Sequence, residues 1–342
     1  MCSGIRRGIR RLIQLTVILL TPLSWVTPAH AGLTLEELLK KSHFDASEVE
    51  RVRGGALGVA RIHEISDREL AVVIACQVEV ASEDALAPFL GESLPIDETL
   101  LKQQGLIDTE LQEASFDAIP LGRDDHDEIR HYLEAKPDVG LNLSSDEIAA
   151  FQALKDSDDP AAVEAVLRDM LRARYTSYRA GGLAAARPYA REEGGHVSPG
   201  EELRKTEENM TGLHELYPAF HNAWLRYPRE LPDDIVGEDF FWVKLDIEGR
   251  PAFVLSHRLV AKDRDMHLVG IRDYYVSHFL DVSQRAAVVT RVESGENILL
   301  YIERIWVDHW SGFAKLAKKI GHKILRTQME HLLENHGVCG GS

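Results

Sequence analysis

Hydrophobic and polar residues alternate along the last third of the chain, and a period of two is typical of β-strands. Polar connectors of two to five residues separate the alternating runs. They are too short for the crossover that parallel strands need. We therefore predict a five-stranded antiparallel meander, with strands at residues 239–247, 250–260, 266–279, 284–292 and 297–307.

Two earlier runs, residues 56–65 and 69–80, show the same alternation, and the short polar stretch SDR between them predicts a hairpin. Ser82 and two acidic residues come next, at positions where a helix dipole favours carboxylates. We predict a short helix there, which Pro88 should end early.

Between residues 95 and 235 the period becomes helical. The clearest helix is expected to begin after Asp159 and Pro160 and to stop at Gly181. Its apolar stripe consists of Val163, Val166, Leu167, Met170, Leu171 and Tyr175. We interpret this block as a large helical insertion.

A long amphipathic helix is predicted after the last strand. Its lysines, Lys315, Lys318, Lys319 and Lys323, should remain in solvent. Its apolar face is expected at Phe313, Leu316, Ala317, Ile320, Ile324, Gln328 and Leu332. The fold class is therefore α+β, an antiparallel sheet with a long C-terminal helix and a large helical insertion.

The first 31 residues have the pattern of an export signal, with four arginines, a short apolar core and the small residues AHA at the end. We expect cleavage near Ala31, a periplasmic or secreted protein and no stable membrane insertion afterwards. The mature chain then divides into a first core segment (32–94), the helical insertion (95–235), the meander with its helix (236–336) and a flexible tail (337–342).

Charge narrows the range of partners. The formal net charge is −16, and removal of the four signal arginines makes it about −20. Nucleic acids require a basic face, so we expect none as a partner. The same balance disfavours an electrostatic grip on anionic lipid headgroups.

Cysteines are few, and Cys2 leaves with the signal. Cys76 lies in the apolar run AVVIACQVEV and Cys339 in the tail GVCGGS. A bridge between them is chemically allowed in an oxidising compartment, but tails are rarely fixed against a core strand. We therefore predict an inert buried thiol at Cys76, no disulfide framework, and stability from burial alone.

Two stretches carry a family resemblance. The run AVVIACQVEVASEDALAPFL is similar to the opening strand and helix of the START and polyketide-cyclase-like superfamily, and IERIWVDHWSGFAKLAKKI is similar to its last strand and helix. The chain also resembles a group of exported bacterial proteins to which no activity is attached. The START-like resemblance implies a helix-grip fold, in which a curved sheet and a helix enclose an apolar cavity for lipid-like molecules.

The joint between the last strand and the helix would border such a cavity. Trp306, Trp310 and Phe313 are candidate ligand-binding residues there, although aromatic residues in this position also serve as plain core. Leu300 and Ile302 share the face of Trp306. Which face of the sheet points inward is left open by the sequence.

Arg304 interrupts the apolar run ILLYIERIWV on the face of Leu300, Ile302 and Trp306. If that face is inward, the guanidinium needs an anion, either a carboxylate of the protein or one of the ligand. Glu303, on the other face, would then be exposed.

Acid-base chemistry has only weak candidates, namely His257, His278 and Tyr274, which lie in neighbouring predicted strands. No nucleophile or partner spacing accompanies them, and they also fit a solvated outer face of the sheet. His126 and His131 are five residues apart, which does not match a zinc-binding pair on a helix. We predict no metal site and no cofactor.

These patterns favour an exported protein that binds or carries a hydrophobic small molecule in the cell envelope without catalysis. A second hypothesis is a cyclase- or hydrolase-like enzyme that uses the same cavity. A third is a structural envelope protein without a ligand, in which the helical block serves as an interaction surface.

Overall fold

The computed structural model describes residues 33–120, 125–156, 159–229, 231–263, 266–307 and 314–339. The predicted export signal, and the start of the mature chain at Gly32, lie outside these residues. So do Trp310 and Phe313. In the described part of the chain, no helix combines the length and the apolar composition needed to cross a membrane.

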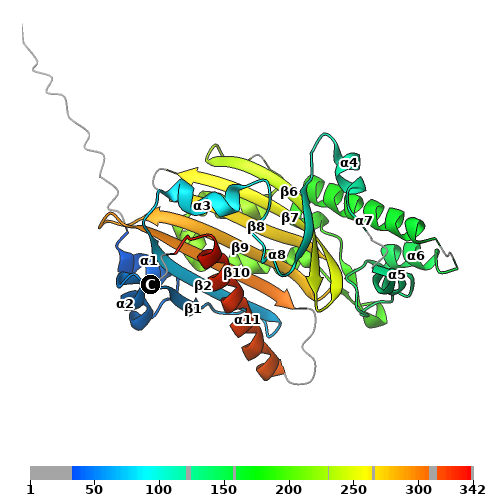
Figure 1. Cartoon of the computed structure of the whole chain (residues 1–342), viewed down its shortest axis with the longest axis horizontal. Helices are drawn as coiled ribbons and strands as arrows, with labels where there is room; N and C mark the ends of the chain where they lie inside the picture. Colours follow the sequence, from blue (N-terminus) through cyan, green and yellow to red (C-terminus); the bar gives the residue numbers. More distant parts are fainter. Residues whose placement is uncertain are drawn as a thin grey trace, which may run out of the picture. The chain divides into compact units, whose positions relative to one another are not determined.

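The protein is a mixed α+β structure built on one eight-stranded antiparallel sheet. The strand order is β1-β2-β10-β9-β8-β7-β6-β3, so the predicted meander β6 to β10 and the hairpin β1–β2 are both confirmed (Figure 1). The bounds are β1 Gly58–Arg61, β2 Glu69–Val78, β3 Leu101–Leu106, β6 Ile235–Ile247, β7 Arg250–Asp263, β8 Met266–Val276, β9 Leu280–Arg291 and β10 Asn297–Val307.

Two strand predictions were wrong. The strand β3 lies inside the block that we predicted to be helical, and it pairs with β6 as an edge strand. None of the residues of β3 is fully buried, so the strand does not require apolar side chains. Its sequence LKQQGL therefore shows little hydrophobic alternation. The strand β9 begins at Leu280, in a stretch that we assigned to a connector.

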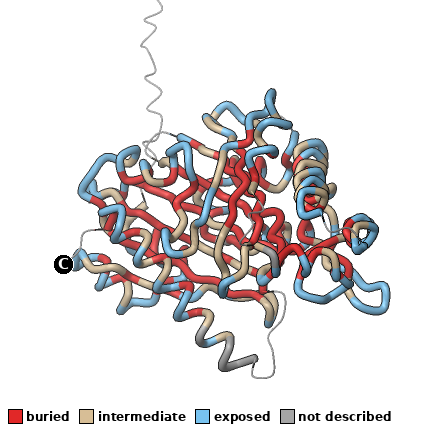
Figure 2. The backbone as a smooth tube through the Cα atoms, turned by 45° about the vertical axis from the view of Figure 1, so that its right-hand side comes forward, coloured by how far each residue is buried: buried red, intermediate tan, exposed pale blue. Residues whose placement is uncertain are grey.

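Both faces of the sheet are covered, which explains why most of its strand residues are buried (Figure 2). On one face lie α3 (Ser82–Leu90) and α11 (Ala314–Asn335) (Figure 1). We call this the α11 face, and its sheet residues include Val72, Ile74 and Tyr301. Pro88 does not end α3, which continues to Leu90.

The apolar side of α11 differs from the predicted one by one position. Leu325, Met329 and Leu333 are buried against the sheet, whereas Ile324 is 52% exposed. A shift of one residue turns a helix by about 100°, so Ile324 faces solvent. Lys319 and Lys323 are exposed, as expected.

The opposite face is the α10 face, to which Val288, Leu300 and Ile302 belong. It is covered by α1 (Leu35–Lys41), α2 (Ala46–Arg53), α8 (Pro199–Glu208), α9 (Thr211–Leu216) and α10 (Pro218–Arg226). Helix and sheet approach closely at Gly270, where an added Cβ would lie 2.5 Å from the ring of Phe220. The layers here are in direct contact.

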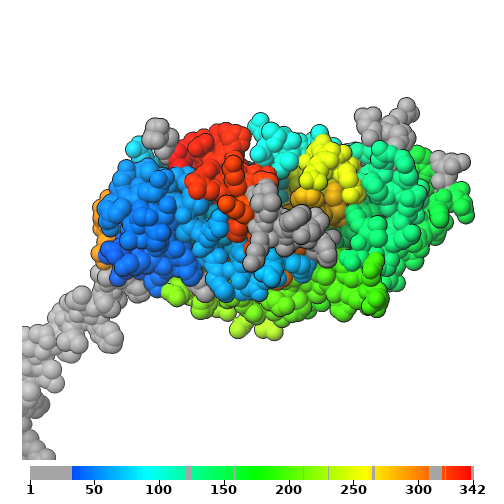
Figure 3. Space-filling model, turned by 90° about the horizontal axis from the view of Figure 1, so that it is seen from below, coloured from blue at the N-terminus to red at the C-terminus, as the bar shows by residue number. Residues whose placement is uncertain are grey.

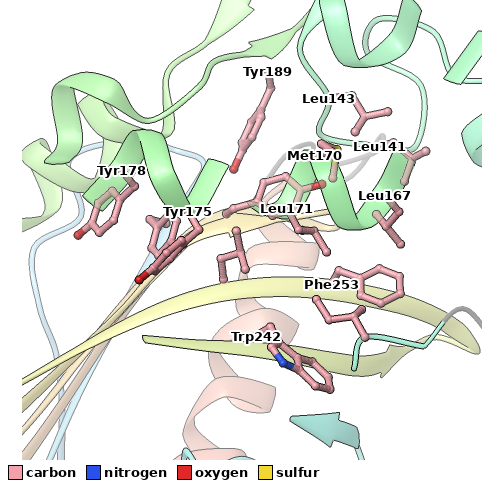
Figure 4. Close-up of a cluster of buried hydrophobic side chains, with 14 of the residues drawn as sticks. Leu141, Leu143, Leu167, Met170, Leu171, Tyr175, Tyr178, Tyr189, Trp242 and Phe253 are labelled. Atoms are coloured by element: carbon pink, nitrogen blue, oxygen red, sulfur yellow. The ribbon is translucent and has the colours of Figure 1, made fainter. Parts of the chain in front are cut away.

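The helical block occupies one end of the sheet. It contains α4 (Gln112–Asp117), α5 (His126–Leu133), α6 (Ser145–Gln152) and α7 (Pro160–Gly181), followed by the short strands β4 (Tyr189–Ala190) and β5 (His196–Val197). Asp159 caps α7 as predicted, by accepting a hydrogen bond from the backbone N–H of Ala161. Figure 4 shows the buried stripe of α7 against Trp242 of β6 and Phe253 of β7.

The C-terminal tail corrects two further predictions. Cys339 forms a disulfide with Cys76 of β2, across 263 residues of sequence. Val338 and Cys339 are buried, so the described part of the predicted flexible tail is attached to the sheet. A hydrophobic strand position gave no sign of this pairing, because a buried thiol and a buried disulfide leave the same sequence pattern.

Candidate functional site

The predicted ligand-binding residues of β10 lie on the face away from α11. Leu300 and Ile302 belong to the core formed with the N-terminal helices and α10. The C-terminal helix instead covers the face of Leu299 and Tyr301. A cavity between α11 and Leu300, Ile302, Arg304 and Trp306 is therefore excluded by the topology.

Arg304 has a structural partner. Its Nε lies 2.8 Å from Glu69 Oε1, and both side chains are fully buried. Its other nitrogens donate to the backbone carbonyls of Asn209 and His63, at 3.2 and 2.9 Å. The sequence left open whether the anion beside Arg304 comes from the protein or from a ligand. In the structure it is a carboxylate of the protein, that of Glu69.

Trp306 is core as well. Its indole Nε1 donates to Thr206 Oγ1 at 2.8 Å, and the guanidinium of Arg68 lies 5.5 Å from the ring centroid. The bond to Thr206 joins β10 to α8. Trp306 therefore fastens a helix to the sheet and has no atom left for polar contacts with a ligand.

Of the acid-base candidates, the structure brings two together. The ring of Tyr274 stacks on Tyr178 of α7 at 3.9 Å, and the Tyr178 hydroxyl lies 3.0 Å from His257 Nδ1. Burial lowers the pKa of His257 to about 4, although Glu238 Oε1, 3.3 Å from Nε2, opposes that shift. His257 is thus a neutral, fully buried side chain near neutral pH.

Arg272 continues this polar network inward. It donates to the Tyr178 hydroxyl at 3.3 Å, to Gln284 Oε1 at 2.9 Å and to the carbonyl of Trp224 at 3.1 Å. The residues join α7 and α10 to four strands and are closed off from solvent, apart from Glu238, whose side chain is 35% exposed. The network holds layers together and offers no room for a substrate.

His278 is separate from the other two candidates. It follows β8 and is buried beside Ser277, whose Oγ lies 3.1 Å from His278 Nδ1. Burial lowers its pKa to about 3, with a smaller contribution from Arg250. Among the described residues no cluster of three histidine, cysteine or acidic side chains is arranged to hold a metal ion.

A groove lies instead at the side of α11, where the helix borders the β1–β2 hairpin (Figure 3). Its volume is about 480 Å³, within the range of small-molecule sites. We call it the α11 groove, and its lining consists of Val59, Arg61, Val72, Lys319, His322, Lys323 and Arg326.

The α11 groove combines an apolar floor with a basic rim. Val59 and Val72 form the floor. In the part of the chain that the structure describes, Arg61, Lys319 and Lys323 are exposed and have no carboxylate within ion-pair distance. Together they make the rim locally basic on a chain with a net charge of −16.

Two contacts fix the helix that forms the groove. Glu64 lies 2.6 Å from both Lys318 Nζ and His322 Nε2, which holds the first half of α11 to the loop after β1. The Cys76–Cys339 disulfide holds the chain just beyond the other end of the helix. The groove is thus framed by fixed elements, as a preformed binding site requires.

Sequence reasoning noted the lysines of α11 but assigned them only to solvent. The signal that could have been used is that Lys319 and Lys323 are four residues apart and share a helical face. Nothing in the sequence placed Arg61 beside them, since it comes from a strand more than 250 residues earlier.

Comparison with known proteins adds no assignment. No protein-family model matches the chain, and no curated protein matches it. The chemistry of the site therefore rests on its own geometry.

Proposed function

We propose that this protein binds an anionic amphiphile, such as a fatty acid, in the α11 groove and carries it without catalysis. The apolar floor would take the hydrocarbon chain, and the basic rim would take the acidic head. None of the three acid-base candidates lines the groove, so the proposal includes no reaction.

The observation that carries the proposal is the group of unpaired cations around an apolar floor. Some exposed lysines of this chain have a carboxylate neighbour, as Lys41 does with Glu215 and Lys102 with Asp246. Arg61, Lys319 and Lys323 do not, within the described residues. The acidic head of a ligand would form ion pairs with these cations. Burial of its apolar chain would add about 0.8 kcal/mol of binding free energy per methylene group.

The architecture supports this proposal. Strand β2, which is followed by the short helix α3, pairs with β10, the last strand of the meander, which is followed by α11. This order of elements is that of the helix-grip arrangement that the sequence resembles. The expected cavity between sheet and helix is replaced by a groove at the helix side. Leu325, Met329 and Leu333 of the helix are buried against the sheet.

The disulfide supports the proposed location. Disulfides persist in oxidising compartments such as the periplasm or the extracellular space. Together with the export signal predicted at residues 1–31, a bridge between Cys76 and Cys339 is the arrangement we expect of a periplasmic or secreted carrier.

Titration calorimetry of the purified protein with dodecanoate tests the proposal. The natural protein should bind it, and the double variant Lys319→Ala/Lys323→Ala should bind at least tenfold more weakly, the equivalent of about 1.4 kcal/mol. The matched control is Lys102→Ala/Lys155→Ala, which removes the same charge from exposed lysines outside the groove and should bind normally.

Two outcomes would overturn the proposal. One is the absence of dodecanoate binding. The other is equal loss in the groove variant and in the control, which would reveal a general charge effect. Binding of a poly-glutamate peptide in preference to dodecanoate would identify an acidic protein segment as the occupant and would also contradict a lipid-like ligand.

A further inference from the structure

One row of directly paired residues crosses the α11 face from the groove to the middle of the sheet. Arg61 is opposite Val72, Val72 is opposite Glu303, and Glu303 is opposite Arg285. Val72 therefore lines the groove and also contacts the position of Glu303. Residues paired in this way have Cβ atoms about 5 Å apart.

Glu303 and Arg285 form a polar centre with Asp273. Arg285 Nη1 lies 3.3 Å from Asp273 Oδ2 and 3.9 Å from Glu303 Oε1. Their side chains are only 11 to 14% exposed. Glu303, which the sequence analysis placed in solvent, is thus mostly buried.

Hydrogen bonding in this centre is uneven. Asp273 accepts from Ser256 and Ser283, at 2.6 and 2.8 Å, in addition to Arg285. Among the described residues, the Nε–H of Arg285 is buried without an acceptor. An unsatisfied buried donor costs free energy, and Arg285 retains one in addition to its ion pair with Asp273.

The carboxyl group of Glu303 already accepts from the Tyr301 hydroxyl, and its remaining acceptor capacity together with the free donor of Arg285 matches a hydroxyl group. A hydroxyl oxygen accepts from the Nε–H, and its proton is donated to a carboxyl oxygen. A second anion fits less well, because Asp273 already balances the charge of Arg285. Burial raises the pKa of Glu303, which agrees with a site for a neutral group.

The distance between the two sites suggests one ligand that reaches both. Arg61 and Arg285 are separated by three strand spacings, about 15 Å. We propose that the ligand of the α11 groove is an anionic amphiphile with a hydroxyl group at the end remote from its acid, and that Arg285 and Glu303 bind this hydroxyl. The inference rests on the proposed function and specifies its ligand class.

A pair of probes isolates the hydroxyl group, because 12-hydroxydodecanoate differs from dodecanoate only by that group. The natural protein should bind the hydroxy acid about tenfold more tightly, as expected for a hydrogen bond to a charged group. In Glu303→Leu this preference should fall to about onefold. A control variant, Glu293→Leu in the exposed β9–β10 turn, should keep the preference.

The two proposals fail in different ways. Equal affinities of the natural protein for both probes would overturn the hydroxyl site and leave the groove intact. Failure to bind either probe would overturn the proposed function itself. A preference that persists in Glu303→Leu would also overturn the assignment, and the comparison of the two probes on the natural protein decides the matter even if that variant does not fold.

Discussion

Two neighbouring rows of residues cross the same sheet, one on each face, and they differ in how their polar side chains are buried and paired. The row on the α10 face contains His257, Arg272, Gln284 and Arg304, which are paired strand to strand and almost completely buried. The row on the α11 face contains Arg285, Glu303, Val72 and Arg61, and it ends in an open groove.

Partners explain the difference. On the α10 face Tyr178 of α7 contacts His257 and Arg272, and Glu69 of β2 pairs with Arg304, although Nη2 of Arg272 is buried without an acceptor in the described chain. On the α11 face Arg285 keeps a donor without an acceptor, and Arg61 has no described carboxylate partner. Changes in the first row should affect stability, and changes in the second should affect binding.

The largest expected effect is at the buried ion pair. Replacing Glu69 with leucine leaves the charge of Arg304 buried and unpaired, which should lower the free energy of unfolding by about 3–5 kcal/mol. The double variant Glu69→Leu/Arg304→Met removes both charges and should recover most of that loss. Urea unfolding monitored by circular dichroism measures both. If the double variant is no more stable than the single one, the pair is not the source of the effect.

The disulfide ranks next. Opening a loop of 263 residues should cost about 2–4 kcal/mol, because the unfolded chain gains conformational freedom. The thermal unfolding temperature of the natural protein should fall on reduction, and that of Cys76→Ala/Cys339→Ala should not respond to the reductant. Equal values with and without reductant in the natural protein would mean that the bridge does not form.

His257 should make stability depend on pH. Its pKa is about 4 in the folded protein and 6.5 when unperturbed, so the unfolded state binds the proton more readily. Stability from this residue is complete above pH 6.5 and is lost as the pH falls towards 4. Between pH 7 and pH 5 the natural protein should lose about 2 kcal/mol more than His257→Asn. Parallel losses in the two proteins would show that His257 is accessible to protons in the folded state.

The smallest effect on stability is expected in the groove. Lys319→Ala/Lys323→Ala changes exposed side chains that have no ion-pair partner in the described part of the chain, so the free energy of unfolding should shift by less than about 0.5 kcal/mol. Chemical unfolding in the absence of ligand is the measurement. A larger loss would mean that these lysines stabilise the fold, and their role in binding would then have to be reassessed.

Much of the sheet could be predicted from the sequence, because alternation and short connectors leave few alternatives. The meander, the β1–β2 hairpin and α7 with its Asp159 cap follow from local patterns. The strand β3 escaped because an edge strand buries little and has a weak apolar signal. The apolar side of α11 was misplaced because its first turns contain several lysines and alanines. These residues allow more than one helical face to be read as the apolar one.

The candidate site was the harder part to predict. Arg304 was correctly singled out as needing an anion, but its partner Glu69 is 235 residues away. The groove joins Arg61 to α11, and the pairing of Glu303 with Arg285 depends on strand register. Such distant combinations leave no trace in a local window of sequence.

By itself, the sequence determined which segments become strands and helices, since period, caps and breakers act over a few residues. Only the tertiary structure decided which face of the sheet α11 covers, that Cys76 and Cys339 meet, and which charged side chains remain without a partner. The reason is physical: secondary structure depends on neighbours along the chain, whereas burial and charge pairing depend on neighbours in space, and packing alone brings those together.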